Sequence, residues 1–115
     1  MTRICFHLQV RPELIDEYIE IHRSVWPQML RAIEDSGRSN YSLFLRDDGL
    51  LVGYYETDDD AESARRLAED SRTKEWEEQA QRFFVALEGG RADQGAPVLR
   101  EVFNLEEQIA SLDAR

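Results

Sequence analysis

Tyr18, His22 and Trp26 recur at every fourth residue in the segment YIEIHRSVWP, residues 18–27. An α-helix turns about 100° per residue, so the three side chains would share one edge of a helix. A buried histidine or tyrosine needs a polar partner, and a purely structural ridge would more simply be leucine or isoleucine. The stripe is typical of a pocket wall that is apolar in body and polar at its tips.

Pro27 ends this stripe and predicts a break in the helix. Proline has no N–H to donate, and it pushes the preceding residue, Trp26, away from helical torsions. We expect the helix to kink or restart here and to open space beside His22, whose imidazole could serve as a general acid or base. The residues alone leave a second interpretation open, in which His22 is a satisfied core histidine and Pro27 is only a kink.

Other polar groups make weaker candidate sites. His7 lies on the polar face of a predicted strand, where a dimer interface would explain it. The acidic run 56–62 is better interpreted as a solvated helix start than as a metal site, because neither a histidine nor a fixed ligand spacing accompanies it. Trp76 has helical spacing to Phe83 and is expected to pack in the core.

Three sequence patterns position the main elements. Every second residue of 3–10 is apolar, a period that marks a half-buried strand. The helix with the aromatic stripe begins at Pro12, which is tolerated in a first turn, and stops at Ser36-Gly37. Asp48-Gly49 predicts the turn of a hairpin. Asp58 or Asp59 is expected to cap the second helical region.

The predicted elements run strand, helix, strand, strand, helix, strand. Their expected bounds are 3–10, from Pro12 to the stop at Ser36-Gly37, 40–46, 50–57, 60–87 (with a break near 70–73) and 98–105. This is the ferredoxin-like β-α-β-β-α-β order, α+β, in which a four-stranded antiparallel sheet carries two helical regions on one face. The other face would be solvated or covered by a partner, which favours a homodimer. Residues 1–105 are expected to form one domain, and residues 106–115 a short acidic tail that can form a helix.

Composition narrows the classes of function. The chain has 115 residues and a formal net charge of −10, so nucleic acid and anionic membrane surfaces would repel it. Its one cysteine, Cys5, excludes an intramolecular disulfide. The N-terminus lacks the apolar region of a signal peptide, and no apolar run reaches the roughly 20 residues of a membrane helix. We expect a cytoplasmic protein with a small-molecule ligand.

Several segments taken together resemble the L-rhamnose mutarotase family. They are an early strand ending in QV, the pattern Y-x3-H-x3-WP, the segment NYSLFL, a tryptophan on the second helix, and LREVFNL. The resemblance covers residues 3–105. It implies a ferredoxin-like dimer of the dimeric α/β-barrel type and an isomerase that interconverts the α and β anomers of L-rhamnose without cofactor or metal.

The resemblance also implies roles for particular residues. His22 matches the family's catalytic acid–base histidine, and Tyr18 and Tyr41 match tyrosines that bind the sugar. Trp76 matches the first of two adjacent tryptophans that contact the sugar. The second position is Glu77, which departs from the pattern and either points to solvent or offers an acceptor to a sugar hydroxyl. Because of this change the sugar could be another 6-deoxy sugar, such as L-fucose.

Two other classes of function are compatible with the predicted architecture. One is a cofactor-free monooxygenase or a haem-binding protein with an apolar cavity beside the first helix, in which His22 or His7 could ligate the haem iron. The other is a non-catalytic ligand-binding dimer, which would bind a sugar without accelerating anomer exchange. The combination of Tyr18, His22 and Tyr41 suits a ligand rich in hydroxyl groups better than haem or an aromatic substrate, whereas turnover distinguishes an enzyme from the non-catalytic dimer.

Overall fold

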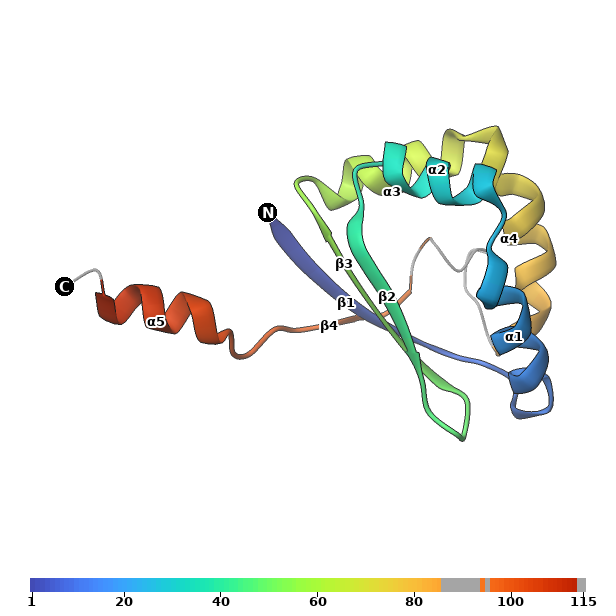
Figure 1. Ribbon diagram of the computed structural model, residues 1–115, viewed down its shortest axis with the longest axis horizontal. Coiled ribbons are helices and arrows are strands. Elements are labelled where there is room, and N and C mark those ends of the chain that lie inside the picture. The colour runs from blue at the N-terminus through green and yellow to red at the C-terminus, as the bar shows by residue number, and fades with distance from the viewer. Residues whose placement is uncertain (86–93, 95, 114–115) are drawn as a thin grey trace.

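The structure, a computed structural model, describes residues 1–85, 94 and 96–113. Its sheet has four strands in the antiparallel order β2-β3-β1-β4, and the helices between the strands cover one of its faces (Figure 1). The strands are β1 Thr2–Gln9, β2 Ser39–Leu45, β3 Leu50–Thr57 and β4 Val98–Leu99. This arrangement confirms the predicted ferredoxin-like fold class.

β1 lies in the middle of the sheet and carries part of the core. It pairs with β3 along its whole length, from Thr2 opposite Thr57 to Gln9 opposite Leu50. Phe6 and Leu8 are buried on the helix side, whereas Cys5, His7 and Gln9, which alternate with them, are half-exposed. The alternation in the sequence therefore predicted both the strand and the face that it buries.

Short helices and 3₁₀ turns replace the two long predicted helices. The helices are α1 Ile15–Ile21, α2 Pro27–Asp35, α3 Asp60–Glu69, α4 Lys74–Ala80 and α5 Leu105–Asp113. Asp59 caps α3 by accepting a hydrogen bond from the backbone N–H of Glu62 at 3.1 Å. A 3₁₀ turn at Ser71–Thr73 separates α3 from α4, which confirms the predicted break.

The end of the second helical region differs from the prediction. A last 3₁₀ turn, Gln81–Phe83, follows α4, and Phe84 then forms an antiparallel bridge with Val10. Helical structure therefore ends before residue 87, because the chain turns back to the end of β1 and packs its phenylalanines into the core. Residues 86–87 and most of the glycine-containing loop 88–97 lie outside the described residues.

The last strand is shorter than predicted. β4 contains Val98 and Leu99 only, paired with Phe6 and Cys5 of β1, and residues 100–104 leave the sheet. A strand at an edge of a sheet makes ladder hydrogen bonds on one side only. Beyond β4 the contact with β1 continues through side chains, because the guanidinium of Arg3 binds the carboxylate of Glu101 at 2.7 Å.

α5 projects away from the rest of the molecule, beyond β4 (Figure 1). The residues of this helix are exposed, and a second contact from Arg3, to Glu107 at 2.6 Å, ties it to β1. The molecule consequently measures 52 × 32 × 26 Å along its principal axes. None of the helices in the described part of the chain is long and apolar enough to cross a membrane.

Candidate active site

The break at Pro27 positions the first candidate residue, His22. α1 ends at Ile21, His22–Ser24 form a 3₁₀ turn, and Val25 and Trp26 are extended before Pro27 starts α2. Proline is favourable at the first position of a helix because its missing N–H would have no partner there. The predicted restart is thus confirmed, and His22 lies at the end of a helix where its ring can reach a cavity.

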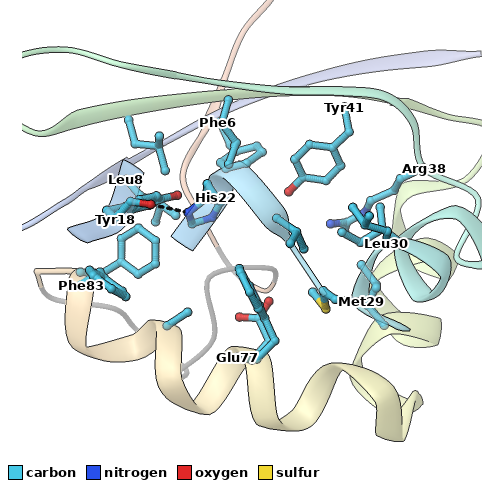
Figure 2. Close-up of a pocket in the computed structure, with 18 residues that line it drawn as sticks. Phe6, Leu8, Tyr18, His22, Met29, Leu30, Arg38, Tyr41, Glu77 and Phe83 are labelled. Atoms are coloured by element: carbon cyan, nitrogen blue, oxygen red, sulfur yellow. Dashed lines mark hydrogen bonds between the residues drawn. The ribbon is translucent and has the colours of Figure 1, made fainter. Parts of the chain in front are cut away.

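Tyr18 holds the ring of His22 from two directions. The imidazole stacks on the phenol ring with centroids 4.1 Å apart and an angle of 10° between the planes. Nδ1 of His22 lies 2.8 Å from the backbone carbonyl oxygen of Tyr18 (Figure 2, dashed line). A carbonyl oxygen can only accept, so the geometry assigns the proton to Nδ1 and leaves Nε2 for other contacts.

Trp76 of α4 closes the other side of His22. Its ring meets the imidazole edge-on, with centroids 5.5 Å apart. Trp26 in turn packs edge-on against Trp76 at 5.2 Å, behind the pocket wall rather than in it. The continuous ridge predicted for Tyr18, His22 and Trp26 is therefore wrong at its third member, because the chain leaves the helix before Trp26.

These residues border a cavity of about 420 Å³ between the sheet and the helices. Small-molecule sites in proteins typically enclose about 300–1,000 Å³. The wall is mostly apolar and includes Phe6, Leu8, Met29, Leu51 and Phe83. Tyr18, His22, Tyr41, Trp76 and Glu77 all line it, so the structure brings every predicted site residue to one pocket.

A distortion of β2 directs Tyr41 toward this pocket. Asn40 has a left-handed backbone with φ of 47°, which asparagine tolerates better than most residues, and the register shifts between Ser39 and Ser42. The ring of Tyr41 stacks on Tyr55 with centroids 5.2 Å apart. Its hydroxyl points into the cavity (Figure 2).

Tyr18 keeps its proton at neutral pH. Burial is the main cause that raises the pKa of its hydroxyl above the ordinary value of 10, and the nearby Tyr41 and Glu77 raise it further. Burial has the opposite effect on His22 and lowers the pKa of its imidazole below 6.5, against a smaller raising effect of the Tyr18 carbonyl. The resting site therefore contains a neutral imidazole beside a protonated phenol.

Glu77 lies inside the molecule, and the alternative that it points to solvent is wrong. The residue is 4% exposed, and its carboxylate lies at the pocket wall formed by α4 (Figure 2). α4 turns both Trp76 and Glu77 toward the core. A carboxyl group in an apolar pocket can accept hydrogen bonds from hydroxyl groups, which an indole at the same place could not do.

Arg38 also lines the pocket, and sequence reasoning missed it. Its side chain is 3% exposed, although arginine is among the residues least often buried. It follows Gly37, whose φ of 97° turns the chain from α2 into β2. In the sequence it stands next to a helix stop signal, where a charged residue is ordinarily solvated, so only the tertiary structure reveals it.

The described residues do not form a metal site. Among residues 1–85, 94 and 96–113, no group of three histidine, cysteine, aspartate or glutamate side chains is placed to hold a metal ion. His7 of β1 pairs with Val52 of β3 and lies on the sheet face opposite the pocket. His22 is the histidine that reaches the cavity.

The sequence model of the L-rhamnose mutarotase family matches residues 3–105. The chain belongs to this family. An L-rhamnose mutarotase from Oceanobacillus iheyensis is 36% identical over 77 residues, which cover 66% of this chain and 73% of the relative. An L-fucose mutarotase from Xanthomonas campestris is 30% identical over an alignment covering 96% of this chain and 93% of the relative.

A solved structure supports the same fold. The crystal structure of an L-rhamnose mutarotase from Formosa agariphila superposes with a TM-score of 0.72 at 22% identity, covering 91% of this chain and 99% of that one. Membership of the L-rhamnose mutarotase family confirms the predicted isomerase class, the aldose anomerases. The roles of the individual site residues stay predictions. The pocket geometry adds which atoms of these residues can contact a ligand.

Proposed function

We propose that the protein interconverts the α and β pyranose anomers of L-rhamnose, or of a related 6-deoxy sugar such as L-fucose, by opening and closing the sugar ring. The observation that carries the proposal is the His22 arrangement. A neutral imidazole, fixed by Tyr18, borders a cavity whose wall also carries tyrosine hydroxyls and a carboxyl group. Relatives named for both sugars support this substrate class.

The reaction needs proton transfer at two oxygen atoms of the sugar. In ring opening, a base takes the proton of the anomeric hydroxyl, the carbonyl forms, the bond from the anomeric carbon to the ring oxygen breaks, and that oxygen gains a proton. Rotation about the first carbon–carbon bond and the reverse steps on the other face give the second anomer. Neither redox chemistry nor a covalent enzyme intermediate is needed for this sequence.

His22 is proposed as the central acid–base group, acting through Nε2. Since Nδ1 contacts the Tyr18 carbonyl, Nε2 is the nitrogen that can exchange a proton with the sugar. The lowered pKa means that the ring begins neutral, so it takes the anomeric proton first and returns it on closure. The opposite direction, in which His22 donates to the ring oxygen, would require the less populated imidazolium.

Tyr18 and Tyr41 are proposed to bind sugar hydroxyls, and one of them to pass the complementary proton to the ring oxygen directly or through water. Tyr18 suits the donation of a hydrogen bond to a sugar oxygen, because its hydroxyl stays protonated. Trp76 is proposed to pack against a C–H face or the methyl group of the sugar, since aromatic rings offer a large apolar surface. Glu77 is proposed to accept a hydrogen bond from a hydroxyl group of the substrate.

Proton NMR saturation transfer between the α and β anomeric signals tests the proposal. The protein should accelerate transfer in L-rhamnose, and the acceleration should disappear in His22→Ala. A Glu20→Gln variant, changed at an exposed position of α1, is the matched control and should behave as wild type. If no 6-deoxy sugar exchanges faster, the proposal fails, and haem titration and oxygen uptake with aromatic substrates become the next measurements.

We also propose that two copies pair through the open face of the sheet. Phe44, on the face of β2 away from the pocket, is 64% exposed, and Leu99 of β4 is 45% exposed. Exposed apolar residues gathered on an uncovered sheet face are typical of an interface. Light scattering should give twice the mass of one chain, and Phe44→Glu should shift the protein to monomer. A wild-type protein of single-chain mass at micromolar concentration would contradict the pairing.

A further inference from the structure

Arg38 places a cation at the wall of a pocket that is otherwise mostly apolar. The residue is 6% exposed and its side chain 3% exposed, so the guanidinium is removed from bulk water. Burying such a charge is costly unless hydrogen bonds and opposite charge compensate it. The contacts that compensate Arg38 therefore show how much of its binding capacity the protein itself uses.

The protein holds Arg38 from the side of α3. Its Nε donates a hydrogen bond to Oγ of Ser63 at 3.0 Å, and its Nη2 lies 3.8 Å from Oδ1 of Asp60. The second distance is too long for a hydrogen bond, so Asp60 supplies charge compensation without taking up a donor. The guanidinium carbon also lies 4.2 Å from the ring centroid of Tyr55, a cation–π arrangement.

These contacts leave most of the guanidinium available. A guanidinium has five N–H groups, and within residues 1–85, 94 and 96–113 only Nε donates a hydrogen bond to the protein. The side chain lines the pocket, and its guanidinium end lies at the cavity beside Leu30 (Figure 2). A guanidinium that α3 holds on one side, with N–H groups still available on the pocket side, is suited to bind a ligand.

His22 and Arg38 lie toward opposite ends of the pocket, with the hydroxyl of Tyr41 between them (Figure 2). A pyranose that reacts beside His22 has its anomeric carbon at that end. The hydroxyls on the third and fourth carbons lie across the ring and would reach the other end. These two hydroxyls are neighbours, and the planar fork of an arginine suits a pair of adjacent oxygen atoms.

We propose that Arg38 determines sugar specificity by donating hydrogen bonds from its two Nη groups to the hydroxyl oxygens on the third and fourth carbons of the sugar. The assignment rests on the proposed mutarotase function. A neutral sugar fits the charges better than an anionic one, because Asp60 already accompanies the guanidinium and Glu77 borders the same cavity. Arg38 would thereby recognise the hydroxyl groups of the sugar that lie farthest from the reacting anomeric carbon.

Fluorescence of the protein's tryptophans tests the proposal without requiring turnover, because Trp76 borders the pocket. L-rhamnose and its 2-, 3- and 4-deoxy derivatives are titrated into wild type and Arg38→Lys, which keeps the charge but loses the fork. Wild type should bind the 3- and 4-deoxy sugars roughly tenfold or more weakly than L-rhamnose. Arg38→Lys should bind L-rhamnose roughly tenfold or more weakly than wild type does. In Arg38→Lys, removal of the 3- or the 4-hydroxyl from the sugar should lower the affinity by at most a few-fold.

This coupling between side chain and hydroxyl distinguishes binding from a structural role. A variant that is only destabilised would lose affinity for every sugar by the same factor. Arg66→Lys is the control, because Arg66 is an exposed arginine of α3 and should change neither affinity nor selectivity. Equal sensitivity to the deoxy sugars in wild type and Arg38→Lys would overturn the assignment.

Two further outcomes are decisive. If Arg38→Lys does not fold, wild type alone decides: removal of the 3- or 4-hydroxyl must weaken binding more than removal of the 2-hydroxyl, and any other order refutes the proposal. If a sugar acid binds wild type more tightly than L-rhamnose, Arg38 is a carboxylate site instead. Anomer exchange measured in parallel separates the hypotheses, since binding without exchange refutes only the mutarotase function, and exchange without coupling refutes only the role of Arg38.

Discussion

The imidazole of His22 lies flat against the phenol of Tyr18 at 4.1 Å, and its Nδ1 contacts the carbonyl oxygen of the same residue at 2.8 Å. A single residue one helical turn earlier thus sets both the orientation and the tautomer of the ring. The 3₁₀ turn after α1 makes this possible, because His22 follows the last residue of α1 and its side chain folds back. The arrangement depends on local sequence, which explains why the spacing of Tyr18 and His22 indicated a site.

His22→Ala should lower the rate of anomer exchange by about 10²–10⁴-fold, the usual contribution of a general acid–base group. The fold should remain, because the side chain is half-buried and packs at the pocket edge. Exchange by NMR and circular dichroism of the same sample measure the two effects. An unchanged spectrum with undiminished exchange would show that another group moves the proton.

The pH profile should follow the lowered pKa of His22, whose main cause is burial. The neutral base persists below pH 6.5, so kcat/KM should stay level through that value and decline only in more acidic solution. Stability has a related dependence: between the two pKa values the unfolded chain binds a proton that the folded one does not. Acidification from pH 6.5 downwards should therefore destabilise wild type more than His22→Gln. A kinetic midpoint at or above 6.5 would contradict the neutral-base mechanism.

Tyr41→Phe should raise KM by roughly 2–10-fold and leave kcat nearly unchanged, because one hydrogen bond to the sugar is lost while the ring stack on Tyr55 is retained. Exchange rates measured over a range of L-rhamnose concentrations separate the two constants. A large fall in kcat at saturating sugar would instead assign Tyr41 to the proton relay.

Glu77→Gln keeps the shape of a residue that is 4% exposed but removes its capacity to carry negative charge. We expect sugar binding to weaken roughly 2–10-fold, because the amide of glutamine offers one acceptor oxygen where the carboxyl group offers two. Glu78→Gln, at the exposed neighbouring position of α4, is the control. Titration by tryptophan fluorescence gives the affinities, and identical values for both variants would remove Glu77 from the binding site.

Gly53→Ala should destabilise the protein by about 1–3 kcal/mol, as overpacking of a core does. A Cβ atom at Gly53 would lie 2.1 Å from the tip of the Phe6 ring. Because that ring also lines the pocket, the displaced Phe6 should reduce sugar affinity as well. Urea unfolding measures the loss, with Ser71→Ala, at an exposed position between α3 and α4, as the control. Equal midpoints for both variants would show that the ring moves aside freely.

Local patterns in the sequence predicted much of the fold. The alternation in β1, the helix restart at Pro27 and the Asp48-Gly49 turn each depend on residues close together in the chain. The short β4 was not predicted, because the apolar residues Val102 and Phe103 are typical of a strand, whereas in the structure they lie exposed beyond the end of β4. Trp26 was misplaced because extended torsions before Pro27 moved it off the helix face.

The candidate site divides in the same way. The spacing of Tyr18 and His22 in the sequence predicts them as site residues. Tyr41, Trp76 and Glu77 were predicted as site residues from the family resemblance. Arg38 gives no signal, because its burial results from α3 and β3 closing around it through Ser63 and Tyr55. A charged residue beside a glycine is ordinary in a sequence, and only packing shows that it is buried.

The projecting helix α5 makes the molecule longer in one direction than in the others, 52 Å against 32 and 26 Å. A body of this shape rotates more slowly about its short axes than about its long axis. Backbone ¹⁵N relaxation should therefore depend on the orientation of each N–H vector in a single chain. If a second copy packs against the tail and makes the particle more nearly spherical, that dependence should fall even as the overall tumbling slows.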